Sequence, residues 1–242
     1  MSLLDELRGG LIVSVQAWPG SAIDDPHVIA AMARAAQEGG AVAVRVQGVA
    51  NIEAVRARVE VPIVGLIKRE YAGFEPYITP TLAEVAEVLG AGAEIVTFDA
   101  TARPRPGGVE LRAIVEAIVA GGGTPMADCS TLTDAKAAVA VGCRMLATTL
   151  CGYTEETRGH RLPALDLVAA LRQSFDRLRT SAQGDTGGGT CFVVCEGGVH
   201  SPSQLREALD AGADAVVVGT AITNVDWLVR EFAGSADRVP NG

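Results

Sequence analysis

Lysine is almost absent from this sequence. The chain has two lysines, Lys68 and Lys136, against 18 arginines. Because arginine supplies most of the positive charge, a lysine placed directly after an apolar stretch suggests a special role. Lys68 follows such a stretch, IVGLI. A buried lysine can lose its proton and act as a base or form a Schiff base, which arginine cannot do. Chance is the alternative, since codon bias could also produce the excess of arginine.

Aromatic residues and net positive charge are also lacking. Aromatics make up 4% of the chain and hydrophobic residues 48%, so we expect an aliphatic core, which suits buried parallel strands covered by helices. The net charge of −9 argues against a surface for nucleic acid or for an anionic membrane. A small anionic substrate is still allowed, because a few local groups can hold it.

Paired cysteine motifs and long apolar runs are missing as well. The five cysteines include no C-x-x-C pair, which favours a reduced protein over a disulfide scaffold or a zinc site. No run reaches membrane-spanning length, and the first residues, MSLLDELRGG, lack a signal-peptide pattern. We therefore expect a cytoplasmic protein without a membrane partner.

The 242 residues alternate between apolar strand-like runs and helical stretches. The expected strands cover residues 11–16, 41–46, 62–67, 94–98, 125–127, 144–148, 192–195 and 215–218. The expected helices follow them at residues 26–37, 51–59, 82–89, 109–120, 132–141, 164–178, 201–209 and 222–232. Asn51, Thr81 and Ser201 are expected to cap the helices that they precede or begin.

An internal sequence repeat indicates how these strand and helix units are arranged. EGGAVAVRV, GAGAEIVTFDA, VGCRMLATT and DAGADAVVVGT each place a helix-ending glycine before a strand. Their glycines, at positions 40, 92, 142 and 212, are 52, 50 and 70 residues apart. A period near 50 residues corresponds to two βα units, one quarter of a (β/α)8 barrel of the TIM type. The rival is an open doubly wound sheet, but its Gly-rich fingerprint is missing after the first strand.

We therefore predict the α/β class and a single-domain (β/α)8 barrel over residues 1–233, beginning with a short amphipathic lead-in. A C-terminal tail is expected over residues 234–242. The Gly-rich stretch over residues 180–190, TSAQGDTGGGT, is expected to form a surface loop.

Polar residues stand at the end of almost every expected strand. They are Gln16, Arg45, Lys68, Asp99, Asp128, Thr148 and Glu196, with Gly219 and Thr220 after the last strand. In a (β/α)8 barrel these ends meet at one face, where the chemistry takes place. Each residue has a structural alternative: a backbone partner, a buried ion pair, a cap or a core hydroxyl. No histidine falls at a strand end, so an acid–base pair would come from lysine and carboxylates.

Glycines follow the last two expected strands. The pairs Gly197-Gly198 and Gly219-Thr220 leave backbone N–H groups free at the position where such barrels usually hold phosphate. Ordinary tight turns are the alternative.

Eight segments in order resemble one family. They are LIVSVQAWPG, AVAVRVQGVANI, PIVGLIKREY with YITPT, FDATARPRP, MADCSTL, LATTLCGYT, CEGGVHSP and VVGTAIT. Together they resemble N-acetylmannosamine-6-phosphate 2-epimerases over roughly residues 11–232. The resemblance implies a (β/α)8 barrel that interconverts N-acetylmannosamine 6-phosphate and N-acetylglucosamine 6-phosphate in sialic acid breakdown. It implies neither an organic cofactor nor a metal, and its partner would be a small sugar phosphate.

The resemblance also implies roles for individual residues. Lys68 would be the catalytic base and Glu196 its acid partner. Gln16, Arg45 and Asp128 would bind the sugar, and Thr148 is added as a substrate-binding candidate at its strand end. Gly197, Gly198, Gly219 and Thr220 would hold the phosphate. The chain departs from the family at Gly198 and Asn224, where arginine is common.

Other functions fit parts of the pattern. Lys68 could form a Schiff base in an aldolase-like lyase. The barrel could also bind a sugar phosphate without turning it over, or hold a flavin phosphate. A homodimer is considered beside a monomer.

Overall fold

Eight parallel strands close into one barrel. The computed structural model describes residues 2–181 and 191–235, and each strand pairs with the next in sequence while the last pairs with the first. The strands are β1 (Gly10–Val15), β2 (Ala43–Gln47), β3 (Ile63–Leu66), β4 (Ile95–Asp99), β5 (Thr124–Asp128), β6 (Met145–Ala147), β7 (Phe192–Glu196) and β8 (Ala215–Val218). The predicted (β/α)8 fold is confirmed.

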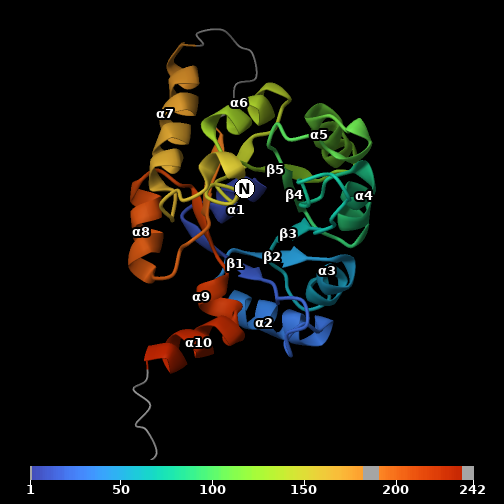
Figure 1. Cartoon of the computed structure of the whole chain (residues 1–242), viewed down its shortest axis with the longest axis vertical. Helices are drawn as coiled ribbons and strands as arrows, with labels where there is room; N and C mark the ends of the chain where they lie inside the picture. The colour runs from blue at the N-terminus through green and yellow to red at the C-terminus, as the bar shows by residue number, and fades with distance from the viewer. Residues whose placement is uncertain (1, 182–190, 236–242) are drawn as a thin grey trace, which may run out of the picture.

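Helices connect the strands and surround them (Figure 1). The α-helices are α1 (Leu3–Leu7), α2 (Pro26–Glu38), α3 (Val49–Arg56), α4 (Leu82–Gly90), α5 (Leu111–Ala120), α6 (Leu132–Ala140), α7 (Leu165–Ser181), α8 (Pro202–Asp210), α9 (Thr220–Thr223) and α10 (Val225–Ser235), and two short 3₁₀ turns are η1 (Pro106–Gly108) and η2 (Glu155–Thr157). No helix within these described ranges is long and apolar enough to cross a membrane.

Two apolar layers hold the barrel together. One layer fills the gap between strands and helices, as the continuous Val, Ile and Ala runs of the strands require. The other fills the barrel interior, where Ile12, Met126 and Phe192 pack with Leu7 of α1. Leu7 is fully buried, which contributes about 1.5–3 kcal/mol. The lead-in helix therefore lies in the middle of the ring and closes one end of the barrel (Figure 1).

The helix starts show which capping predictions were right. Thr81 caps α4 in a capping box with Glu84, and Ser201 caps α8 with Pro202 at the first helical position, as predicted. The expectation for Asn51 was wrong. α3 begins earlier, after Gly48 in a left-handed conformation at φ 88°, and the Asn51 side chain donates to the carbonyl of residue 47 instead.

The last predicted helix is broken in two. Asn224, at φ −91° and ψ 86°, separates α9 from α10, and its Oδ1 accepts a 2.9 Å bond from the backbone N–H of Trp227. A side chain that caps α10 must sit outside the helix, which explains the break. α10 also continues to Ser235, into the expected tail. α7 continues to Ser181, and the rest of the Gly-rich stretch lies outside the described residues.

Candidate active site

A cavity of about 260 Å³ opens at the carboxyl ends of the strands. It lies at the end of the barrel opposite to α1. Eight of the ten predicted site residues line it: Gln16, Arg45, Lys68, Glu196, Gly197, Gly198, Gly219 and Thr220. Asp128 and Thr148 are not among its lining residues. The topology thus brings together residues that lie up to 204 positions apart in the chain (Gln16 to Thr220).

Arg45 is the centre of a buried ion-pair network. Its Nη2 donates to Asp128 Oδ2 at 2.7 Å, and its Nη1 donates to Asp128 Oδ1 at 3.2 Å and to Glu196 Oε2 at 2.7 Å. The side chains of Arg45 and Asp128 are 2% and 0% exposed. Asp128 therefore lies behind Arg45 and fixes it by a two-point contact, while Arg45 itself forms part of the cavity wall.

Glu196 ends β7 and faces the cavity. Burial raises the pKa of its carboxyl to about 7, and the nearby Asp128 adds to this, while Arg45, a hydrogen bond from Thr149 and Lys68 oppose it. Only Oε2 has hydrogen-bond partners in the described part of the chain, so Oε1 is free to meet a ligand. A carboxyl that titrates near neutral pH can both donate and accept a proton.

Lys68 follows β3 and lines the same cavity as Arg45 and Glu196. Its side chain is exposed to the open cavity. Its ammonium makes no hydrogen bond or ion pair to the residues that the structure describes. Partial burial is the main cause that lowers the pKa of Lys68, and the positive charge of Arg45 lowers it further. The negative charges of Glu196 and Asp128 oppose this shift. The shift favours the neutral amine, the form that can take a proton.

Two consecutive threonines follow β6: Thr148 bonds to backbone atoms, and Thr149 bonds to carboxylate side chains. Thr148 is fully buried, donates to the carbonyl of Glu196 at 2.9 Å and accepts from its N–H at 3.0 Å. Thr149 lines the cavity, and its hydroxyl lies 2.7 Å from Asp128 Oδ1 and 3.1 Å from Glu196 Oε2. Sequence reasoning selected Thr148 and missed Thr149. The double threonine in LATT was the available signal.

Gln16 follows β1 and lines the cavity next to Ser14. Its Nε2 donates to the Ser14 hydroxyl at 2.8 Å, and its Oε1 is buried without a hydrogen-bond partner among the described residues. A buried amide oxygen without a partner is costly, so this group is suited to receive a donor from a bound molecule.

The β7 and β8 loops form the other end of the cavity. Gly197 and Gly198 have backbone φ values of 106° and 71°, which residues with a side chain rarely adopt. A Cβ on Gly198 would also lie 2.4 Å from the Cβ of Leu162. This contact explains why an arginine cannot simply be placed at this position. His200 lines the same end, and its ring centroid lies 5.2 Å from that of Trp227. The sequence prediction did not include His200, because it does not stand at a strand end.

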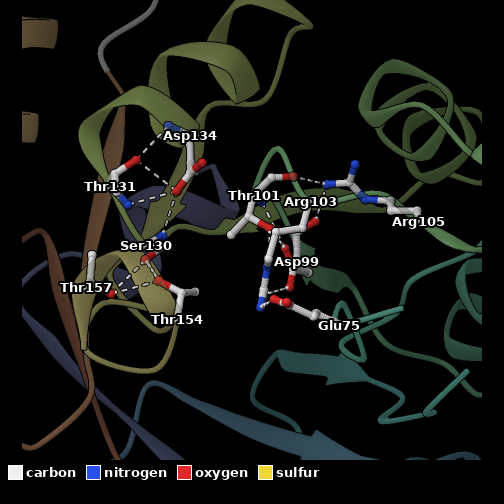
Figure 2. Close-up of polar contacts among 10 residues, drawn as sticks. All are labelled: Glu75, Asp99, Thr101, Arg103, Arg105, Ser130, Thr131, Asp134, Thr154 and Thr157. Atoms are coloured by element: carbon white, nitrogen blue, oxygen red, sulfur yellow. Dashed lines mark hydrogen bonds and ion pairs between the residues drawn. The ribbon is translucent and has the colours of Figure 1, made fainter. Parts of the chain in front are cut away.

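Asp99 ends β4 but does not join the cavity. It accepts hydrogen bonds from the backbone N–H and the hydroxyl of Thr101 at 2.9 and 2.6 Å, and from Arg103 at 2.6 Å. Figure 2 shows these contacts of Asp99. Thr101 and Arg103 also line one side of a second hollow of about 390 Å³, which shares no lining residue with the first. Ser130 and Thr154 lie on its other side, joined by a 2.5 Å hydrogen bond. Asp99 therefore has the alternative, structural role.

No group of three or more His, Cys, Asp or Glu side chains is arranged to hold a metal ion in the described ranges. The ionisable groups at the strand ends are a lysine, an arginine and three carboxylates, and Lys68, Arg45 and Glu196 among them line the cavity. This combination in a (β/α)8 barrel defines a class of enzyme that moves protons with its own side chains.

Comparison with known proteins identifies the family within this class. Residues 29–238 match the model of the family described as "Putative N-acetylmannosamine-6-phosphate epimerase", and the chain belongs to this family. A relative from Enterobacter sp. (strain 638) is 39% identical, with 98% of this chain and 96% of the relative covered. One from Thermosynechococcus vestitus is 42% identical, with 97% and 96% covered. Both are named "Putative N-acetylmannosamine-6-phosphate 2-epimerase".

Solved structures agree with the sequence comparison. The N-acetylmannosamine-6-phosphate 2-epimerase from Clostridium perfringens superposes with a TM-score of 0.86 at 36% identity, covering 98% of this chain and 97% of that chain. A thiamine phosphate pyrophosphorylase from Pyrococcus furiosus has a TM-score of 0.57 at 16% identity, which is a likeness of fold alone.

Proposed function

We propose that this protein is an isomerase that epimerises N-acetylmannosamine 6-phosphate at C2 to N-acetylglucosamine 6-phosphate, in amino-sugar and sialic acid catabolism. The observation that carries the proposal is that Lys68 and Glu196 line one cavity in a chain that belongs to this family. The pKa of Lys68 is lowered and that of Glu196 is raised to about 7, which brings both groups toward neutral pH. Proton removal and return at one carbon needs groups of this kind.

The chemistry follows from the acidity of C2. In the open-chain sugar, C1 is an aldehyde, and the C2–H bond next to it can be broken with its electron pair passing into an enolate. The neutral amine of Lys68 takes the proton, and an ammonium or carboxyl group returns one to the other face of C2. Glu196 assists ring opening by moving the proton between the C1 hydroxyl and the ring oxygen. No atom is lost or gained, as an epimerisation requires.

The phosphate would lie against the β7 and β8 loops. Gly197, Gly198, Gly219 and Thr220 offer backbone N–H groups there, and Thr220 adds a hydroxyl. Thr223, Asn224 and His200 add further polar side chains to the wall at this end. Gln16 and Arg45 would contact the sugar between the two ends, with Asp128 acting through Arg45.

The direct test is incubation of the protein with N-acetylmannosamine 6-phosphate in D2O while C2 is followed by NMR. We expect deuterium to enter C2 as N-acetylglucosamine 6-phosphate appears. Product without deuterium would contradict exchange with solvent, and absence of product would reject the function. Treatment with borohydride separates the Schiff-base alternative, because a covalent adduct on Lys68 would be trapped and seen as added mass.

A second copy of the chain is the partner that we propose besides the substrate. α10 extends away from the barrel (Figure 1) and has no buried residue in the described part of the chain. Val225, Val229 and Phe232 form an exposed apolar stripe on it, 48%, 60% and 77% exposed. Light scattering after size-exclusion chromatography would show a dimer of twice the mass, and Phe232→Glu should shift it toward the monomer. The cytoplasmic location is still a prediction from composition alone.

A further inference from the structure

Thr149 stands between the two carboxylates of the site. Its hydroxyl oxygen is 2.7 Å from Asp128 Oδ1 and 3.1 Å from Glu196 Oε2. A threonine hydroxyl has one hydrogen, so it can donate to only one of these oxygens at a time. The other carboxyl group then either carries a proton and donates it to the hydroxyl oxygen, or makes no hydrogen bond with the hydroxyl.

The two carboxylates differ in their contacts and in their access to the cavity. Asp128 is fully buried, does not line the cavity, and accepts two hydrogen bonds from Arg45. Glu196 shares one nitrogen of Arg45, and its 13% exposed side chain faces the cavity with a free Oε1. The charged groups around Glu196 are Arg45 from β2, Asp128 from β5 and Lys68 after β3. Glu196 is thus the carboxyl that changes protonation state.

The backbone of Glu196 is fixed separately. Thr148 holds its N–H and its carbonyl, so the carboxyl does not have to move when its charge changes. What has to change is the direction of the hydrogen bond that it receives. Rotation about the Cβ–Oγ bond of Thr149 is enough for this, because both acceptors already lie within hydrogen-bond distance.

We propose that Thr149 is a positioning residue whose hydroxyl follows the proton on Glu196. When Glu196 is ionised, Thr149 donates to Oε2. When Glu196 carries a proton on Oε1, Thr149 turns and donates to Asp128. The threonine keeps its own hydrogen throughout, and the proton passes only between Glu196 and the substrate. This inference rests on the proposed function for its place in catalysis, but not for its effect on the ionisation of Glu196.

Removal of the hydroxyl tests the idea with little change of shape. Thr149→Val loses a donor that stabilises the ionised form, so the pKa of Glu196 should rise by about one unit, the usual effect of one hydrogen bond to a charged group. Thr149→Ser keeps the hydroxyl and should restore the value. Thr133→Val, at an exposed position of α6, is the matched control and should change nothing.

Two measurements read the result. The first is the titration of the Glu196 carboxyl in protein labelled with 13C-glutamate, assigned by comparison with Glu196→Gln. The second is the pH profile of kcat/KM with the sugar phosphate. We expect both to shift upward in Thr149→Val and to return in Thr149→Ser, with circular dichroism unchanged.

Other outcomes would overturn the proposal. A fall in activity without a shift of either curve would mean that Thr149 only packs or contacts the substrate. An equal shift in Thr149→Ser, which keeps the hydroxyl, would mean that loss of the hydroxyl is not its cause. If the wild-type protein epimerises nothing, the proposed function fails, whereas the NMR titration still decides whether Thr149 controls Glu196.

Discussion

The two ends of the cavity are built on different principles. At one end, Arg45, Asp128 and Glu196 form a buried network of charges, with Lys68 beside it. At the other end, the β7 and β8 loops offer glycine backbone, two threonines, an asparagine and a histidine. No lysine or arginine lines this wall within the described residues. Charge is concentrated where protons would move and is sparse where a phosphate would be held.

The difference follows from how each end is attached to the fold. The charged side chains come from strands or from the residues directly after them, so the barrel fixes their directions. The glycine end would depend on backbone N–H groups of a loop in which Gly197 and Gly198 have positive φ values and line the cavity. Proton transfer needs tuned pKa values, whereas an anion can be held by neutral donors.

The largest effect is expected from Lys68. Lys68→Met keeps the length of the side chain and removes the amine, so we expect kcat to fall about 10³-fold because the general base is lost. Lys136, exposed on α6, is the other lysine of the chain, and Lys136→Met is the matched control. Exchange at C2 in D2O measures both variants. Normal exchange at C2 in Lys68→Met would show that Lys68 is not the general base.

Asp128 should matter most for stability. Asp128→Asn leaves Arg45 buried with one charged partner, Glu196, in place of two. Breaking a buried pair in this way should lower the free energy of unfolding by about 3 kcal/mol. Asp166→Asn removes an exposed carboxylate that pairs with His160, and should cost less than about 0.5 kcal/mol. Urea denaturation at pH 7 compares the two. Equal losses would show that the network contributes little to the stability of the fold.

Replacement of Glu196 should raise the free energy of unfolding at high pH, whereas replacement of Asp128 should lower it. Its folded pKa of about 7 lies above the ordinary 4.5, so the folded chain binds more protons than the unfolded chain between these values. Stability therefore falls as pH rises through this window, because ionised Glu196 is unfavourable in the fold. Glu196→Gln does not titrate and should be more stable than wild type by about 2 kcal/mol at pH 8. The difference should disappear near pH 5. A wild type that is more stable at pH 8 would mean that Arg45 outweighs burial.

The sequence allowed the barrel and most of the charged end to be predicted. Helix-ending glycines before apolar runs recur with the period of two βα units, and parallel strands must bring their carboxyl ends to one face. That rule alone placed Arg45, Lys68 and Glu196 together. It did not decide which strand-end residue faces the cavity. On a strand, a shift of one residue turns a side chain to the other face, so Thr148 was chosen although Thr149 lines the wall.

Loop geometry was beyond the sequence argument. Asp99 turns to Thr101 and Arg103, and Asn224 caps α10, because local hydrogen bonds compete with the cavity for these side chains. His200 reaches the cavity only through the course of the β7 loop. Such contacts join residues by turns of the backbone rather than by the regular register of strands.

The smallest effect is expected at the glycine end. His200→Gln should raise KM for the sugar phosphate about five-fold, since one hydrogen bond is worth about 1 kcal/mol, and leave kcat nearly unchanged. Inhibition by inorganic phosphate should weaken by a similar factor. His27→Gln, at an exposed position of α2, is the control. If His200→Gln lowered kcat as strongly as a change at Lys68, the two ends would be parts of one catalytic group. A change confined to KM and to phosphate inhibition would instead mean that this end supplies binding alone, and that neutral donors hold most of the phosphate.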